Sequence, residues 1–156
     1  VVFKEGSRVA EELSLGFKDG TTYCVAPIVA GNGTDGTKLA SFDYWAVGIN
    51  CCNPLPPATF WCGRSDLTNP AAHGAVRWMG DSARGFFQLA IQQAEAEYGY
   101  QAVNPILYTW TKDPVADVED MRSAGMDFLM GLTVKFALLQ AIFVIGVIFF
   151  LSPTGM

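Results

Sequence analysis

The sequence is poor in histidine and in positive charge, and each shortage argues against a class of function. His73 is the only histidine, and nothing in its AAHGAV context marks it as the base of a Ser-His-Asp or Cys-His arrangement. Before residue 128 the chain has nine Lys and Arg against 15 Asp and Glu. This acidic balance disfavours nucleic acid and anionic lipid as partners, because both require basic patches.

Motifs for catalysis and metal binding are also missing. There is no CxxC pair, and vicinal cysteines crowd a tetrahedral zinc site, so we expect no metal. The glycine-rich stretch 31–36 lacks the Lys-Ser/Thr and the following helix of a phosphate loop. Asp43 is expected to be a buried acid, but no second carboxylate pairs with it, and Glu95 and Glu97 are expected to be solvated. A membrane-anchored enzyme would need a pocket that gathers Asp43, His73 and a nucleophile, and we predict no enzymatic activity.

What the sequence does contain is one long apolar run at residues 128–151, FLMGLTVKFALLQAIFVIGVIFFL. Lys135 is the only charge among its 24 residues. At ~1.5 Å per helical residue it reaches roughly 36 Å, which exceeds a ~30 Å hydrocarbon core. We therefore predict a single transmembrane helix at 128–151. An acidic connector at 115–127, helical where it enters the membrane, precedes it, and a short uncharged tail at 152–156 follows.

One side of this predicted helix differs from the rest. A step of ~100° per residue places five residues within about 100° of one another. They are Thr133, Ala137, Gln140, Ala141 and Val144. Small residues let a second helix come close, and the Gln140 amide can hydrogen-bond across the contact. Lys135 lies roughly opposite and can reach back to the headgroups. We predict packing against other integral membrane subunits in the bilayer, with a simple lipid anchor as the alternative. Gln140 is also a candidate chlorophyll ligand.

Residues 23–114 predict a small α+β domain. Apolar runs rich in β-formers indicate strands at 23–29, 41–50 and 106–110, and Pro27 indicates an edge strand or a bulge. Residues 83–98 predict an amphipathic helix, capped by Asp81 or Ser82 and ended by Gly99. Its apolar face consists of Phe86, Phe87, Ala90, Ile91, Ala94 and Tyr98.

Three other segments are less strongly patterned. Residues 71–79 predict a short helix, and 53–60, with three prolines, predict a loop. Residues 1–22 suit an N-terminal arm on a partner or a packed element, with Ser7 as the cap of a short helix. No basic and apolar signal sequence opens the chain, so we expect any targeting peptide to have been removed.

The four cysteines, Cys24, Cys51, Cys52 and Cys62, predict two disulfides. A bond between the neighbours Cys51 and Cys52 closes a strained ring. We therefore expect Cys24 to pair with one of them and Cys62 with the other, which leaves two connectivities open. Each bridge would contribute roughly 2–4 kcal/mol and would place the domain in an oxidising, lumenal or extracellular compartment. Four reduced core thiols are the alternative.

Several stretches of this domain are distinctive. They are YCVAPIV at 23–29, DYWAVGINCC at 43–52, FWCG at 60–63, FFQLAIQQAEAEYG at 86–99 and TWTKDP at 109–114. Together they resemble a cysteine-containing domain of uncharacterised membrane proteins from dinoflagellates and related algae. The resemblance implies an algal membrane protein and supplies no catalytic residue. A small acidic chain with one membrane helix is also similar in design to accessory subunits of photosystem–antenna supercomplexes, an analogy of architecture. That analogy implies chlorophyll or carotenoid at the membrane helix and no intrinsic cofactor.

The sequence thus predicts a non-catalytic, single-pass accessory subunit of a larger membrane complex, with a photosystem in a thylakoid as the favoured setting. The alternative is a type I membrane glycoprotein of the secretory pathway with a ligand-binding ectodomain. Asn32-Gly33-Thr34 is an N-glycosylation sequon, and Asn32 is therefore the residue that distinguishes the two settings.

Overall fold

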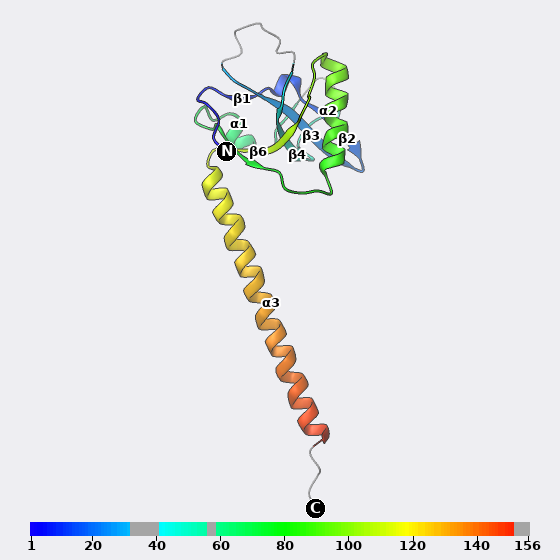
Figure 1. Ribbon diagram of the computed structural model, residues 1–156, viewed down its shortest axis with the longest axis vertical. Helices are drawn as coiled ribbons and strands as arrows, with labels where there is room; N and C mark the ends of the chain where they lie inside the picture. Colours follow the sequence, from blue (N-terminus) through cyan, green and yellow to red (C-terminus); the bar gives the residue numbers. More distant parts are fainter. Residues whose placement is uncertain (32–40, 56–58, 152–156) are drawn as a thin grey trace, which may run out of the picture. The chain divides into compact units, whose positions relative to one another are not determined.

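The computed structural model describes residues 1–31, 41–55 and 59–151. It contains two compact units, Val1–Pro114 and Val115–Met156. The first is a domain built on a mixed sheet, and the second is formed by one long helix (Figure 1). The α+β class and the single long apolar helix predicted from the sequence are both confirmed.

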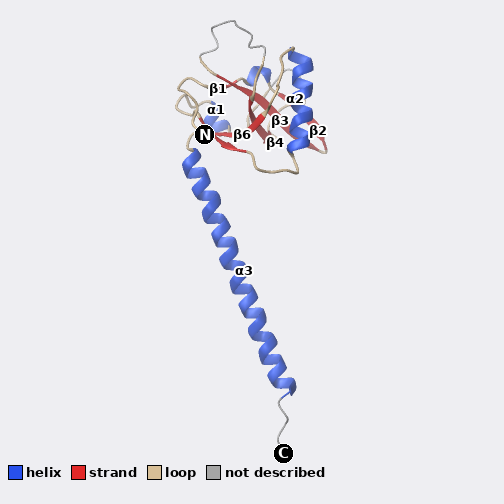
Figure 2. Ribbon diagram, viewed as in Figure 1, coloured by secondary structure: helices blue, strands red, loops and turns tan. Residues whose placement is uncertain are grey.

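The described residues of the domain form a six-stranded sheet in the order β1-β3-β4-β6-β5, with β2 paired to β3 as well. The strands are β1 (Arg8–Val9), β2 (Leu15–Asp19), β3 (Thr21–Val29), β4 (Tyr44–Ile49), β5 (Gly74–Arg77) and β6 (Ile106–Thr111). The helices are η1 (Glu11–Leu13), α1 (Arg64–Leu67), α2 (Arg84–Tyr98) and α3 (Pro114–Leu151). β4 and β6 run parallel, and the other pairs are antiparallel. Figure 2 shows the sheet with its helices.

The two central strands are buried on both faces. Alternate residues of a strand point to opposite sides of the sheet, and here each side has its own core. Val25, Trp45 and Val47 face α2, whereas Cys24, Ala26 and Ala46 face a second core that includes Phe60 and Trp110. Strands covered on both faces read as continuous apolar runs, and for that reason β3 and β4 could be recognised in the sequence.

β3 is a central strand, so the expectation of an edge strand or a bulge at Pro27 is wrong. One edge of β3 is shared by two short strands: β1 ends opposite Ile28, and β2 begins opposite Val25. Pro27 lies between them, and its carbonyl accepts a hydrogen bond from the Ala10 N–H at 2.9 Å. Proline has no N–H to donate, and it stands where the neighbouring strand changes.

α2 matches the predicted amphipathic helix. Phe87, Ala90, Ile91 and Ala94 are its buried residues, and the helix packs over β2 and β3. Gly99 ends it in the left-handed conformation at φ 73°, and its N–H donates to the Glu95 carbonyl. The predicted cap is wrong, because Ala83 occupies the N-cap position and no side chain caps the helix. Asp81 instead forms an ion pair with Arg84 at 3.1 Å.

Two other segments differ from expectation. Residues 71–79 contain a strand, β5, in place of a helix, because Gly74–Arg77 pairs with β6. A Cβ on Gly74 would lie 2.6 Å from Pro114 Cδ and 2.9 Å from the Thr111 carbonyl oxygen, so only glycine permits this approach. The segment 1–22 is a packed element and not an arm, since β1 and β2 belong to the sheet and Val1 donates to the Ala75 carbonyl. Ser7 precedes the strand β1 and caps no helix.

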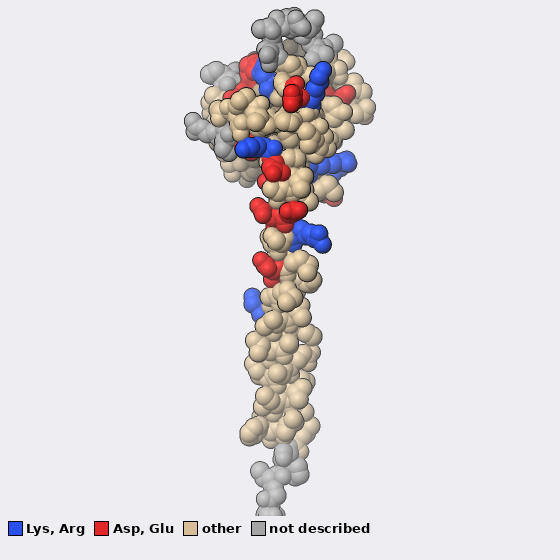
Figure 3. Space-filling view, turned by 90° about the vertical axis from the view of Figure 1, so that its left-hand side faces the viewer, with Lys and Arg blue, Asp and Glu red and all other residues tan. Residues whose placement is uncertain are grey.

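α3 is continuous over 38 residues. The acidic stretch 115–127 forms its first turns, so the connector and the membrane span are one element. The helix is long and apolar enough to cross a membrane. Its most apolar window of 18 residues has a mean hydropathy of 2.5, and no side chain in this window is buried. In Figure 3 its surface carries charges of both signs over about the first half of the helix and none over the rest. The tail 152–156 lies outside the described residues.

Candidate functional site

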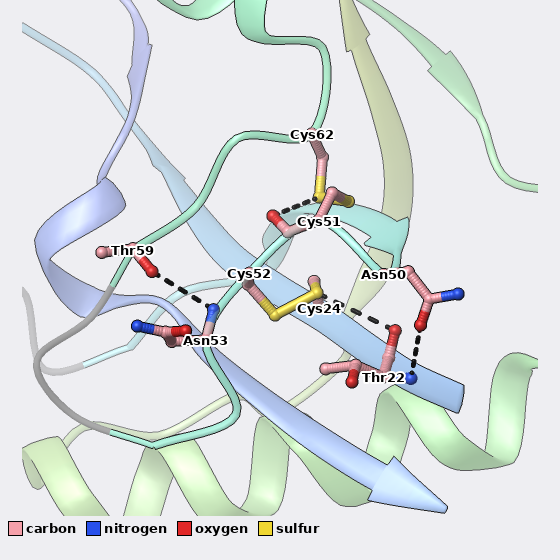
Figure 4. Close-up of a disulfide and its surroundings, with 8 residues drawn as sticks. All are labelled: Thr22, Cys24, Asn50, Cys51, Cys52, Asn53, Thr59 and Cys62. Atoms are coloured by element: carbon pink, nitrogen blue, oxygen red, sulfur yellow. Dashed lines mark hydrogen bonds between the residues drawn. A yellow bond between two sulfur atoms is a disulfide. The ribbon is translucent and has the colours of Figure 1, made fainter. Parts of the chain in front are cut away.

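The candidate site of the domain is a pair of adjacent disulfides, Cys24–Cys52 and Cys51–Cys62. They resolve the two connectivities left open by the sequence, and no cysteine is free. Both bridges lie on the sheet face opposite α2, in the second core (Figure 4). The Cys24–Cys52 pair is buried, with Cys24 at 0% and Cys52 at 6% exposure, whereas Cys51 and Cys62 are half-buried.

Two glycines make room for these bridges. Gly16 on β2, Cys24 on β3 and Gly48 on β4 are direct cross-strand partners, so they form one row on the same face of the sheet. A Cβ on Gly48 would lie 2.5 Å from the sulfurs of both Cys51 and Cys62, and one on Gly16 would lie 2.7 Å from the Cys52 sulfur. The row is therefore a slot in the sheet surface, which we call the glycine slot, and the disulfides fill it.

A turn at Asn50 carries the chain from β4 onto this face. Its φ is +56°, a left-handed conformation that asparagine adopts more readily than most residues. Its side-chain oxygen accepts from the Thr22 N–H at 2.9 Å, and its own N–H donates to the Thr22 carbonyl at 2.7 Å. These two hydrogen bonds fix the turn against β3, and Figure 4 shows the one that the Asn50 side chain accepts. They bring the vicinal cysteines over the glycine slot.

The sulfur atoms lie close together. The Sγ atoms of Cys24, Cys51 and Cys62 are all within 4.8 Å of one another, although Cys24 belongs to a different bridge. Metal ligation requires thiolates, and a bridged sulfur is not one, so the oxidised set offers no thiolate ligand. Once a reductant has opened one bridge, the arrangement can exchange disulfide partners, because exchange begins with a thiolate attacking a disulfide sulfur.

Three of the residues weighed for an active site accept hydrogen bonds within the domain. Asp43 is exposed and not buried as expected; its carbonyl accepts from the Ile106 N–H at 2.7 Å and its carboxylate from the Asn104 N–H at 3.4 Å. The His73 carbonyl accepts from the Phe3 N–H at 2.7 Å. Glu95, expected to be solvated, accepts a hydrogen bond from the Ala102 N–H.

A surface hollow of about 540 Å³ lies beside the proline-containing loop. Its lining residues are Glu11, Asn53, Thr59, Phe60, Trp61, Leu67 and Thr68. One carboxylate, amide and hydroxyl groups and two aromatic rings face it, and no histidine or cysteine does. This lining contains no nucleophile paired with a base, so the hollow lacks the arrangement that acyl or phosphoryl transfer would need.

Two tyrosines at the end of α2 and just after it hold the segment before β2. The Tyr98 hydroxyl donates to the Ser14 carbonyl at 2.9 Å, and the Tyr100 hydroxyl donates to the Leu13 carbonyl at 3.2 Å. Burial raises the pKa of both hydroxyls, that of Tyr100 the further. On the surface nearby, a hydrogen bond from Arg8 lowers the pKa of Glu12. Sequence reasoning missed both tyrosine contacts, since their partners are more than 80 residues distant.

On α3, the residues of the predicted packing face are all exposed: Thr133, Ala137, Gln140, Ala141 and Val144. The Thr133 hydroxyl donates to the Leu129 carbonyl of its own helix at 2.8 Å. The side-chain amide of Gln140 forms no hydrogen bond with any residue that the structure describes. Asn32, the predicted glycosylation site, lies outside the described residues.

Comparison with protein-family models, with curated proteins and with solved structures found no match to this chain. The inferences about function therefore rest on the long apolar helix and the two disulfides. They indicate a single-pass membrane protein whose domain lies in an oxidising compartment.

Proposed function

We propose that the chain is a non-catalytic accessory subunit of a larger membrane protein complex, joined to it through α3. The observation behind this proposal is the unpaired side-chain amide of Gln140 in the apolar span. It is the only side-chain amide of the span, and among the described residues it has no hydrogen-bond partner. A lipid-facing Gln would leave two donors and an acceptor unpaired in hydrocarbon, which costs several kcal/mol.

The surroundings of Gln140 suit a helix as the partner. Thr133, Ala137 and Ala141 lie on the same side of α3 and are small enough for close backbone approach. Thr133 needs no external partner, because its hydroxyl already bonds within the helix. An interhelical hydrogen bond in a membrane contributes about 0.6–2 kcal/mol, and van der Waals contact along the small residues adds to it.

For the setting, we propose a photosystem–antenna supercomplex, with the domain on the lumenal side. The support is the sequence resemblance to algal membrane proteins, the acidic domain, and the bridges, which suit an oxidising lumen. Chlorophyll or carotenoid would then border α3, and the Gln140 carbonyl is the group able to ligate a chlorophyll magnesium.

The proposal is tested by comparing helix variants that are expressed with an affinity tag in cells that make the chain naturally. Gln140→Leu removes the amide, and Ala137→Leu adds bulk to the same side. Gly146→Leu is the matched control, because it adds similar bulk roughly opposite. We expect the first two to lose co-purifying membrane subunits in mild detergent, by about 3- to 30-fold for the amide, and Gly146→Leu to retain them. Equal retention by all three would contradict the proposal.

The secretory glycoprotein remains the second candidate because of the Asn32 sequon. The two settings give opposite results on the purified protein. Mass spectrometry that finds a glycan on Asn32 would exclude the thylakoid, and co-purification with chlorophyll proteins would exclude the secretory pathway.

A further inference from the structure

The two disulfides differ in how far a reductant can reach them. The Cys51–Cys62 bridge is half-buried at the surface of the second core, and we call it the outer bridge. The two residues of the Cys24–Cys52 bridge are buried, and we call it the inner bridge. An external dithiol can therefore approach the outer bridge and not the inner one.

The sulfur positions connect the two bridges. Cys24 Sγ lies within 4.8 Å of both sulfurs of the outer bridge, whereas Cys52 Sγ does not belong to this close set. The glycine slot keeps the space between them free of side chains, since Gly48 has no Cβ to separate Cys24 from the outer sulfurs. Rotation about the Cα–Cβ bond of a released cysteine can close the remaining gap.

We propose that Cys51, Cys62 and Cys24 form a thiol–disulfide relay that passes reducing equivalents from an external dithiol to the inner bridge. The dithiol reduces the outer bridge and is itself oxidised to a disulfide, which leaves two thiols on the chain. The thiolate of Cys51 or Cys62 then attacks Cys24 Sγ. A new bond to Cys24 forms, the Cys24–Cys52 bond breaks, and Cys52 leaves as a thiolate that takes up a proton.

The backbone offers acceptors for the thiols of the reduced form. The carbonyl of Cys51 lies 3.3 Å from Cys62 Sγ, and the carbonyl of Thr22 lies 3.9 Å from Cys24 Sγ (Figure 4). In the bridged state these are only contacts, because a disulfide sulfur carries no proton. After reduction each carbonyl can accept a weak hydrogen bond from the S–H group. The fold thus offers hydrogen-bond acceptors to the thiols of the reduced form. This property does not depend on which membrane partner the chain has.

A matched pair of variants tests the geometry. Cys52→Ser and Cys24→Ser each remove the inner bridge, and they differ only in which sulfur is left free. In Cys52→Ser the free Cys24 faces the outer bridge, and peptide mapping by mass spectrometry should find Cys24 bonded to Cys51 or Cys62 in a substantial fraction of chains. In Cys24→Ser the free Cys52 should leave the outer bridge intact. An intact outer bridge in both variants, or equal exchange in both, would overturn the proposal.

The unaltered chain provides a second test that does not depend on how the variants fold. The full protein in detergent receives less than one equivalent of dithiothreitol, is quenched in acid, unfolded and labelled with a maleimide. The relay predicts label on Cys52, in chains where Cys24 has changed its partner to Cys51 or Cys62. Label confined to Cys51 and Cys62, with the inner bridge intact, would show that the bridges react separately and that no relay exists.

Discussion

Replacing Gly48 with alanine tests whether the glycine slot is required by the disulfides. The new Cβ would lie 2.5 Å from the sulfurs of Cys51 and Cys62 and 2.7 Å from Cys62 Cβ. Real Cβ contacts are not that short, so either the outer bridge shifts or it fails to close. A shifted bridge costs about 1–3 kcal/mol as overpacking, offset by less than about 1 kcal/mol because alanine restricts the unfolded chain. An open bridge loses about 3 kcal/mol for a loop spanning 11 residues.

We therefore expect Gly48→Ala to lower the free energy of unfolding of the domain by about 1–3 kcal/mol. All four tryptophans lie in the domain, so their fluorescence follows its unfolding in denaturant even when α3 stays in a detergent micelle. Gly85→Ala is the control, because its Cβ meets nothing within 4 Å and it lies in α2, where alanine stabilises by about 0.5–1 kcal/mol relative to glycine. If Gly48→Ala were as stable as the control, with both bridges formed, the slot would have no steric role.

Two further predictions concern hydrogen bonds after α2. Burial raises the pKa of Tyr100 in the folded state, so the Tyr100 hydroxyl loses its proton at a lower pH in the unfolded chain. The free energy of unfolding should therefore fall as pH rises above about 10, by up to about 1.4 kcal/mol per pH unit. Tyr100→Phe should cost about 0.5–1.5 kcal/mol at neutral pH by removing the bond to the Leu13 carbonyl, and should weaken that alkaline decline; an unchanged decline would show that another group causes it. Glu95→Ala should cost about 1.5–3 kcal/mol, because it removes a charged acceptor from the Ala102 N–H, whereas the exposed Glu97→Ala on the same helix should change the unfolding free energy by less than about 0.5 kcal/mol. Equal effects of the two glutamate variants would contradict the bond.

The elements that the sequence predicted correctly carry strong local signals. α2 has a helical apolar period and a terminal glycine, α3 is a long apolar run, and β3, β4 and β6 are short runs rich in β-formers. The first two strands escaped prediction because β1 has two residues and β2 begins at a glycine-containing LGF stretch without alternation. β5 was predicted as a helix because alanine favours helices locally. Its pairing with β6, more than 30 residues further along the chain, outweighs that preference.

The candidate site was predicted only in part. The residue types indicated two disulfides, but their connectivity depends on the turn at Asn50 and on the cross-strand register of Gly16, Cys24 and Gly48. The hydrophobic pattern of a strand sets the face on which a residue lies, but its cross-strand partner also depends on the turns that join the strands. The packing face predicted for α3, in contrast, rests on helical spacing alone and stays a prediction.

The central claim is that this chain is a subunit, and its behaviour in mild detergent tests that claim most directly. The native membrane is solubilised, the tagged full-length chain is purified, and the mass and composition of the particle are measured by light scattering and mass spectrometry. We expect the chain to elute with several integral membrane proteins in fixed stoichiometry, and in the proposed setting with chlorophyll absorption. Elution as a single chain in one detergent micelle, with no membrane partner, would contradict the account.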